Sequence, residues 1–416
     1  MKCVGVVAGC CLGALLCAGA QGQSDAGAQR WVGSWAASQQ APEPMNGQPA
    51  LESAKLTDAT LRQVVRLSIG GEMLRVHLSN AFGTRPLTVD SVHVARPGGA
   101  GDGSIDVGTD HAVTFAGESS VTIPIGAEFI SDPVKMKIAG LSDLAISFHL
   151  AEAPAPQSSH VGSRETSYLV HGEHAGDAAL PGAEKQEHWY QIAGVDVAAG
   201  SGARAVVAFG DSITDGHGST TNGNDRWTDV LARRLQGDKA MREVGVLNEG
   251  ISGNHLLTNG LGENALQRMD RDVLALSGVK YVFVFEGIND VGMLARGKKA
   301  KAEEHEVLRA RMIAAYEQIV LRAHAQGLKV IGATMTPFVG SDYYFPTPEN
   351  EADRQAVNAW IRGAGHFDAV VDFDAVVRDP KDGSRMLPAY DCGDHLHPGP
   401  VGYKAMGDAV PLGLFR

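Results

Sequence analysis

Cysteine, aromatic residues and positive charge are all scarce in this chain of 416 residues. Four of the five cysteines stand within the first 17 residues, so Cys392 is left without a disulfide partner in the rest of the chain. The 36 lysines and arginines are outnumbered by 48 aspartates and glutamates, and no basic run alternates with aromatic residues. These scarcities exclude a small disulfide-stapled protein, and we expect no nucleic-acid partner.

Long apolar runs are absent after the N-terminus. At the N-terminus itself, Lys2 precedes the apolar stretch Val4–Leu16, which is shorter than the roughly 18 residues of a membrane helix. Ala18-Gly19-Ala20 then offers a cleavage site of the A-x-A type. We interpret residues 1–20 as a signal peptide and expect a secreted or periplasmic protein with no membrane span. Lipidation of Cys10 is a minor alternative.

Residues 21–199 alternate between apolar and polar, which is typical of half-buried strands. Four runs share this alternation: Val65–Ile69, Leu74–Leu78, Val134–Ile138 and Leu144–Leu150. The first two flank Gly70-Gly71 and predict a β-hairpin. Segments 97–112 and 151–187 are rich in turn-forming residues and predict loops. We expect residues 21–199 to form an antiparallel β-sandwich of the jelly-roll kind.

Residues 200–416 instead alternate between strands and helices. Short apolar runs predict strands at Ala205–Phe209, Val244–Leu247, Tyr281–Phe285, Lys329–Met335 and Ala369–Phe373. Helical periodicity predicts helices at Trp227–Leu235, Ala265–Leu276, Ala302–Ala325 and Asn350–Ile361. This alternation is typical of an α/β domain with a parallel sheet covered on both faces. Active sites in such sheets lie at the carboxyl ends of the strands.

Polar motifs follow three of the predicted strands, and a fourth lies near the C-terminus. They are Gly210-Asp211-Ser212-Ile213-Thr214, Asn248-Glu249-Gly250-Ile251-Ser252-Gly253-Asn254, Gly287-Ile288-Asn289-Asp290 and Asp394-His395-Leu396-His397. Taken singly, each motif could be an ordinary turn or loop. Together they offer a serine hydroxyl, which needs a base to become a nucleophile, and an imidazole to act as that base. Asp394, three residues before His397, can reach the second nitrogen of that ring.

Several other chemistries lack their motifs. The sequence contains no G-x-S-x-G elbow, no H-E-x-x-H zinc motif and no phosphate-binding P-loop. The cluster of Asp394, His395 and His397 supplies too few ligands for a metal site. We therefore expect neither a metal nor another cofactor.

The four motifs, in this order, make the chain from about residue 203 to its end resemble the SGNH (GDSL-type) hydrolases. The name lists four residue types, which here are Ser212, Gly253, Asn289 and His397. The resemblance implies a flavodoxin-like three-layer fold and a serine esterase with a Ser212–His397–Asp394 triad. It also implies an oxyanion hole made of the Ser212 and Gly253 backbone N–H groups and the Asn289 side-chain amide.

The sandwich, which begins Trp31-Val32-Gly33-Ser34-Trp35, is similar to the appended domain of bacterial xylan-acetylesterase-like proteins. We therefore expect an esterase that removes short acyl groups, above all acetyl, from small esters or acetylated polysaccharides. One alternative is a general short-chain esterase or a lipase-like enzyme. Another is a carbohydrate-binding protein whose hydrolase domain is vestigial. The short join at Gly200-Ser201-Gly202 predicts a fixed interface, with sandwich loops beside the site.

Further residues near the motifs have less certain roles. Asp211 and Asp290 are expected to orient loops through hydrogen bonds to the backbone. His395 could lie in the pocket or at the surface, and nothing near Cys392 suggests an activated thiolate. Tyr343-Tyr344-Phe345 could form an aromatic platform for a sugar or could simply pack. The residues that follow the nucleophile motif, His217, Arg226 and Trp227, have no assigned role, and Trp227 fits the apolar face of its helix.

Overall fold

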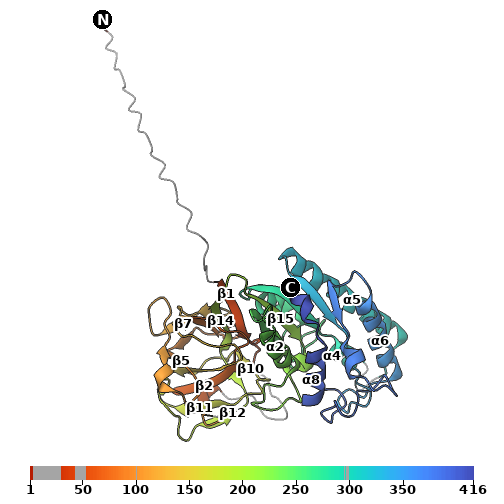
Figure 1. Ribbon diagram of the computed structural model, residues 1–416, viewed down its shortest axis with the longest axis horizontal. Coiled ribbons are helices and arrows are strands. Elements are labelled where there is room, and N and C mark those ends of the chain that lie inside the picture. The colour runs from red at the N-terminus through yellow and green to blue at the C-terminus, as the bar shows by residue number, and fades with distance from the viewer. Residues whose placement is uncertain (3–29, 43–52, 100, 295, 297–298) are drawn as a thin grey trace.

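The alternating N-terminal half forms two antiparallel sheets that pack into a β-sandwich (Figure 1). The structure is a computed structural model that describes residues 1–2, 30–42, 53–99, 101–294, 296 and 299–416. The predicted signal peptide, Met1 and Lys2 excepted, lies outside these residues. We refer to residues 30–199 as the sandwich part and to residues 204–416 as the α/β part.

The strands of the sandwich part fall into two large sheets and two small ribbons. The four-stranded sheet has the order β1 (Arg30–Ala36), β14 (Ile192–Ala199), β3 (Leu74–Ser79) and β8 (Glu128–Ile130). The six-stranded sheet has the order β12 (Glu184–Gln186), β11 (Ser167–His171), β2 (Ala59–Arg66), β9 (Asp143–Leu150), β5 (Ser91–Ala95) and β6 (His111–Ala112). The ribbons pair β10 (Ser159–His160) with β13 (Trp189–Tyr190), and β4 (Leu87–Val89) with β7 (Val121–Ile123). Two short 3₁₀ turns, η1 (Ser53–Leu56) and η2 (Val107–Thr109), complete this part.

The hairpin predicted around Gly70-Gly71 is wrong. Its two strands, β2 and β3, lie in different sheets, and the chain between them crosses from one sheet to the other. In this crossing, the Leu67 N–H donates to the Ser142 carbonyl, and Gly71 forms an isolated bridge with Ile138. The alternation did identify the buried side chains, because Val65 and Val76 are both fully buried. Alternation specifies which face of a strand is buried, but it does not specify the neighbouring strand.

Two further predictions for the sandwich part need correction. The run Val134–Ile138 forms isolated bridges with Leu74 and Gly71 in place of a strand. The predicted loops at 97–112 and 151–187 contain the short strands β6, β10, β11 and β12. The segment between β10 and β11 contacts the α/β part.

The α/β part contains one parallel sheet. Its order is β16 (Val244–Gly250), β15 (Arg204–Gly210), β17 (Val279–Phe285), β18 (Lys329–Ala333) and β19 (Ala369–Val371). Numbered within this part, the order is 2-1-3-4-5, which is the flavodoxin-like order. The five predicted strands are confirmed. The strand order reverses between β15 and β17, the place where ligands bind in such sheets.

Helices cover both faces of this sheet. They are α1 (Ser212–Asp215), α2 (Trp227–Gly237), α3 (Ala265–Met269), α4 (Ile288–Leu294), α5 (Ala302–Ala325), α6 (Pro348–Arg362), α7 (Phe373–Val377) and α8 (Pro400–Ala409). The Trp227 ring of α2 packs on Phe283, whereas Arg268 of α3 lies over Phe209. Phe283 pairs in register with Ala208, so Phe209 points to the opposite face.

One helix is shorter than predicted. The helix predicted for Ala265–Leu276 is α-helical only to Met269 and continues as a π-helical turn, η3 (Asp270–Leu274). The chain ends in a 3₁₀ turn, η4 (Leu412–Phe415).

Among the described residues, no helix is both long and apolar enough to cross a membrane. The longest, α5, has 24 residues and carries charges along its length.

The two parts meet along β1 and β16, with backbone close to backbone. The Gly33 N–H donates to the Ser277 carbonyl at 2.9 Å, and the Val246 N–H donates to Ser68 Oγ at 2.9 Å. A Cβ atom on Gly245 would lie 2.4 Å from the Gly33 carbonyl oxygen, so only glycine fits there. Buried apolar residues of both parts form one continuous core cluster. These contacts agree with the fixed interface expected from the short join.

Replacing Gly245 with alanine tests this close approach. The new methyl group would overlap the Gly33 carbonyl, a backbone atom that cannot move aside without shifting β1. We expect Gly245→Ala to lower the free energy of unfolding by about 1–3 kcal/mol. Urea denaturation followed by tryptophan fluorescence measures the change.

The matched control is Gly237→Ala at the end of α2. Apart from its chain neighbours and the backbone of its own helix, no described residue has a heavy atom within 4 Å of the Cβ position at Gly237. This variant should be neutral or more stable by up to about 1 kcal/mol. Equal stability of the two variants would contradict the tight backbone contact.

Candidate active site

The candidate nucleophile follows β15, at the reversal point of the parallel sheet. Ser212 is the first residue of α1, and the Asp211 side chain caps this short helix by accepting a hydrogen bond from the Ile213 N–H at 3.0 Å. The predicted loop-orienting role of Asp211 is thereby confirmed. Burial raises the pKa of this carboxyl group. Ser212 itself is nearly buried, with 5 % of its surface exposed.

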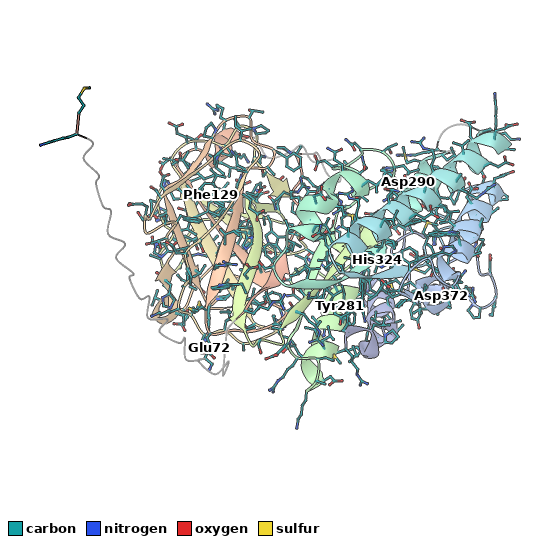
Figure 2. All side chains as sticks on the ribbon, turned by 90° about the horizontal axis from the view of Figure 1, so that it is seen from above. Glu72, Phe129, Tyr281, Asp290, His324 and Asp372 are labelled. Carbon is teal, nitrogen blue, oxygen red and sulfur yellow. The ribbon has the colours of Figure 1, made fainter. Side chains whose placement is uncertain are left out.

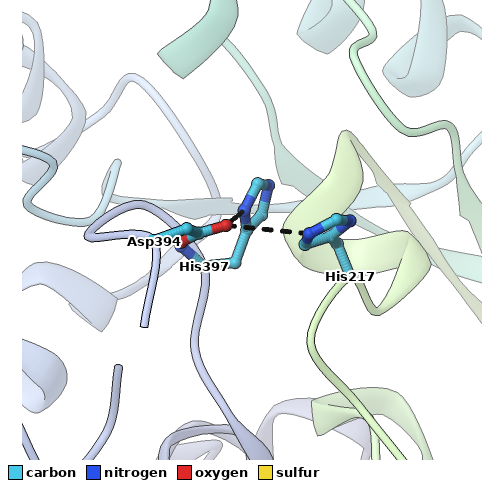
Figure 3. Close-up of side chains that lie close together, drawn as sticks. All are labelled: His217, Asp394 and His397. Atoms are coloured by element: carbon cyan, nitrogen blue, oxygen red, sulfur yellow. Dashed lines mark hydrogen bonds and ion pairs between the residues drawn. The ribbon is translucent and has the colours of Figure 1, made fainter. Parts of the chain in front are cut away.

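The candidate base lies next to this serine. Ser212 Oγ and His397 Nε2 are 2.7 Å apart, and His397 Nδ1 is 2.6 Å from Asp394 Oδ2 (Figure 3 shows the His397–Asp394 pair). A carboxylate accepts hydrogen bonds, so His397 carries its proton on Nδ1 and Nε2 accepts from the serine hydroxyl. The three side chains therefore form a continuous hydrogen-bonded series.

Asp394 is held ionised by its surroundings. Its Oδ1 accepts the backbone N–H groups of Leu396 and His397, and its Oδ2 accepts His397 Nδ1–H. Partial burial alone would raise the pKa of Asp394, but these hydrogen bonds and the neighbouring imidazole hold that pKa far below its usual range. The carboxylate is thus negative at any pH at which the base can act.

The loop after β16 contains the predicted glycine. Gly253 has a φ of +72°, a conformation that side chains rarely adopt, and this explains the residue type. Its neighbour Ser252 donates both its backbone N–H, at 3.0 Å, and its hydroxyl, at 2.5 Å, to Asp215 Oδ2. Asp215 belongs to α1, so this carboxylate ties the glycine loop to the helix that begins with Ser212.

The side-chain amide of Asn289 has a fixed orientation. Its Nδ2 donates to the Asn254 carbonyl at 2.6 Å, and its Oδ1 accepts a short hydrogen bond from the Tyr344 hydroxyl. One Nδ2 hydrogen is thereby used, and the second has no acceptor among the residues that the structure describes. The adjacent Asp290 accepts the N–H groups of Leu256 and Leu257 at 2.7 and 3.0 Å, which confirms its predicted loop-orienting role.

These groups share one edge of the sheet. Tyr281, near the start of β17, and Asp290, after its carboxyl end, lie at opposite edges of the α/β part (Figure 2). Ser212, the Gly253 loop and Asn289 follow the carboxyl ends of β15, β16 and β17 respectively. The predicted residues are therefore brought together at the edge where α/β sheets bind ligands.

His395 and Cys392 lie close to His397 in the sequence, and the structure shows what surrounds each of them. His395 is exposed, has a φ of +60° and bonds through Nδ1 to Asp391 Oδ2 at 2.6 Å, which agrees with the surface alternative. Partial burial and the charge of Asp394 raise the pKa of Cys392 to about 11. The thiol therefore stays protonated at neutral pH, as the sequence suggested.

Two groups of side chains have donor atoms within 4.8 Å of one another: His217 with Asp394 and His397, and Asp391 with Cys392 and Asp394. In the first group, the Arg164 guanidinium lies 3.1 Å from His217, and its positive charge opposes a cation. Both ring nitrogens of His397 already face Ser212 and Asp394. In the second, the thiol would have to lose its proton from a raised pKa. Neither group is suited to a metal ion.

Residues 208–405 match the sequence model of the GDSL-like lipase/acylhydrolase family. This part of the chain is a GDSL-like acylhydrolase domain. It includes all five residues predicted for the site, and its family identifies the protein as an ester hydrolase. No curated protein matches the sequence.

Solved structures that resemble the chain include two with named activities. One is a GDSL-like lipase from Bacteroides thetaiotaomicron, 20 % identical, matching 50 % of this chain and 85 % of the other, with a TM-score of 0.36. The second is an acetylxylan esterase from Geobacillus stearothermophilus, 22 % identical, matching 50 % of this chain and 91 % of the other, with a TM-score of 0.37.

Sequence reasoning missed an arginine beneath the acylhydrolase site. Arg268 of α3 is fully buried and donates to the Gly210 carbonyl, to Asn254 Oδ1 and to Glu286 Oε1. Its position within the predicted helix Ala265–Leu276, between Ala265 and Met269, was the available signal. An arginine on an apolar helix face implies buried acceptors.

A second missed pair joins the sandwich part to the acylhydrolase domain. His160 of β10 lies 3.0 Å from Asp215 Oδ1, and its Nδ1 lies 2.9 Å from the Ser38 carbonyl. Both partners are almost fully buried. A Cβ on Gly162 would collide with the Asp215 carboxylate at 2.0 Å, so glycine is required for this approach. The sandwich part thus touches the residue that anchors Ser252.

Removing the imidazole of His160 would leave the buried Asp215 carboxylate without its hydrogen-bond partner at Oδ1. Burial alone would raise the pKa of Asp215, and His160 holds it lowered. We expect His160→Ala to lower the free energy of unfolding at pH 7 by about 3–5 kcal/mol. Chemical denaturation at that pH measures the loss.

An exposed pair of the same chemistry provides the control. His324 and Asp368 are 2.8 Å apart, but both side chains are substantially exposed. His324→Ala should change the stability by at most about 1 kcal/mol. A loss for His160→Ala no larger than this would mean that the buried pair does not join the two parts strongly.

Proposed function

We propose that this protein is a secreted serine esterase that removes short acyl groups, above all acetyl groups, from carbohydrate esters. One observation carries the esterase mechanism: the series from Ser212 Oγ through both nitrogens of His397 to Asp394, with spacings of 2.7 and 2.6 Å. The predicted signal peptide at residues 1–20 supports secretion.

In the first half-reaction, His397 Nε2 takes the Ser212 proton as Oγ attacks the acyl carbon. Asp394 keeps the ring in the required tautomer and stabilises the imidazolium that forms. The carbonyl oxygen gains negative charge. The Ser212 and Gly253 N–H groups and the second Nδ2 hydrogen of Asn289 stabilise this charge by donating hydrogen bonds to the oxygen. His397 then protonates the departing alcohol.

In the second half-reaction, water replaces the alcohol. His397 removes a proton from this water, which attacks the acyl-serine, and the same three donors stabilise the second oxyanion. The acyl–serine bond then breaks, the acid departs, and His397 returns its proton to Ser212 Oγ. Apart from the attacking water, these steps use only residues of this chain.

The triad assignment predicts which histidine is needed. Ser212→Ala and His397→Ala should each abolish turnover of 4-nitrophenyl acetate, and the double variant should be little worse, because such residues act as a unit. His395→Ala serves as the control and should retain activity, since this exposed ring bonds to Asp391 Oδ2. Loss of activity in His395→Ala, with His397→Ala active, would overturn the assignment.

An aromatic pair near Asn289 supports a carbohydrate alcohol. Tyr344 is buried against Asn289, whereas Tyr343 and Phe345 are exposed, with exposed fractions of 51 % and 69 %. The Tyr343 ring packs edge-on against Tyr344 at 4.7 Å and lies 4.0 Å below the Arg296 guanidinium. Tyr344 therefore belongs to the site itself, and we assign the sugar platform to the exposed rings of Tyr343 and Phe345.

This surface suits a sugar better than a lipid chain. The C–H face of a sugar ring can lie on an aromatic ring while its hydroxyls reach nearby polar groups. A lipase would instead need a wide, contiguous apolar surface around its serine. The intact hydrogen-bonded series argues against a vestigial hydrolase domain. The general short-chain esterase is the second candidate, and the substrate test below separates it from the first.

The platform predicts a substrate-dependent effect of Tyr343→Ala. We expect the KM for an acetylated xylo-oligosaccharide to rise about three- to tenfold, with the KM for 4-nitrophenyl acetate unchanged. The control is Phe129→Ala, which removes an exposed aromatic ring from the sandwich part (Figure 2) and should change neither value. Unchanged kinetics of Tyr343→Ala on both substrates would favour the general short-chain esterase.

A further inference from the structure

A second histidine lies against the proposed base and has no part in the mechanism above. The ring of His217 is 4.1 Å from that of His397, inclined by 41°. Its Nε2 lies 3.6 Å from Asp394 Oδ2, the same oxygen that accepts His397 Nδ1–H (Figure 3). His217 therefore touches both the base and the carboxylate.

The sandwich part determines which nitrogen of this ring carries the proton. Arg164 Nη2 is 3.1 Å from His217 Nδ1. A guanidinium can only donate, so Nδ1 must accept with its lone pair. Burial, together with the positive charge of Arg164, lowers the pKa of His217 to about 4, so the ring is neutral at neutral pH. Its single proton then lies on Nε2, facing Asp394.

Arg164 is held firmly in this place. It has a φ of +50°, which is unusual for a residue with a side chain, and it lies between β10 and β11. The Asn222 N–H donates to its carbonyl at 2.9 Å, and the preceding Ser163 carbonyl accepts a short hydrogen bond from Arg226. Both partners come from the acylhydrolase domain, so this strained turn is clamped against the domain.

We propose that Arg164 and His217 are positioning residues of the esterase. Arg164 fixes the tautomer of His217, and His217 then holds the His397–Asp394 pair in line with Ser212. The inference rests on the proposed function for its effect on catalysis. With the opposite tautomer, the Nε2 lone pair would face the Asp394 carboxylate and repel it. The sandwich part thereby supplies a side chain on which the geometry of the triad depends.

The test compares two substitutions of similar length in the full chain. Arg164→Lys keeps a donor that can reach His217, whereas Arg164→Met keeps the stem and has no donor. We expect Arg164→Met to lower kcat for 4-nitrophenyl acetate about 10- to 100-fold with KM unchanged, and Arg164→Lys to restore kcat to within about threefold of the natural chain. Equal kcat values for the two variants would overturn the proposal.

A second measurement is made on the natural chain and does not depend on turnover. Nitrogen-15 NMR of the natural chain, with labelled histidine and His217→Gln for assignment, reads the tautomer of each ring. We expect His217 to carry its proton on Nε2 at pH 7. A proton on Nδ1, or a doubly protonated ring, would overturn the inference whatever the activity. Absence of ester hydrolysis by the natural chain would instead refute the proposed function alone.

Discussion

The active-site edge of the sheet depends on one buried cation, the guanidinium of Arg268. It has no exposed surface and lies 4.1 Å over the Phe209 ring. Its acceptors come from both parts of the chain: Ser38 Oγ, the Gly210 and Glu249 carbonyls, Asn254 Oδ1, Asp272 Oδ2 and Glu286 Oε1. A buried charge is tolerated only when it is fully paired, so these segments must converge on it.

Acidic side chains lie around this cation. Burial raises the pKa of Glu249 and Glu286 well above the usual range, and their negative neighbours add to the effect. Ser38 of the sandwich part donates to Glu249 at 2.5 Å. The floor of the site is therefore a polar network that both parts of the chain complete. The Gly253 loop contacts this network through Asn254.

The sequence predicted the parts of the molecule whose signal is local. The strand ends and the motif residues Ser212 and Asn289 could be placed because a strand, its carboxyl end and the following polar group are neighbours in the chain. His160 and Arg164 could not be found, because they lie in segment 151–187, which has the composition of a loop. Their contacts form only when that segment meets α1 and the residues that follow it, and periodicity carries no information on such distant contacts. The misassigned hairpin has the same cause.

The pairing of β1 has a consequence for the order of folding. This strand, which lies against the acylhydrolase domain, pairs in its own sheet only with β14, so that Arg30 is opposite Ala199. During synthesis β1 has no partner until the whole sandwich part has been made. Contacts between residues so far apart form slowly, because a long loop must close first. β1 can therefore take its place only after β14 has been made, directly before the strands of the α/β part, so the edge of the sandwich part that contacts β16 forms late.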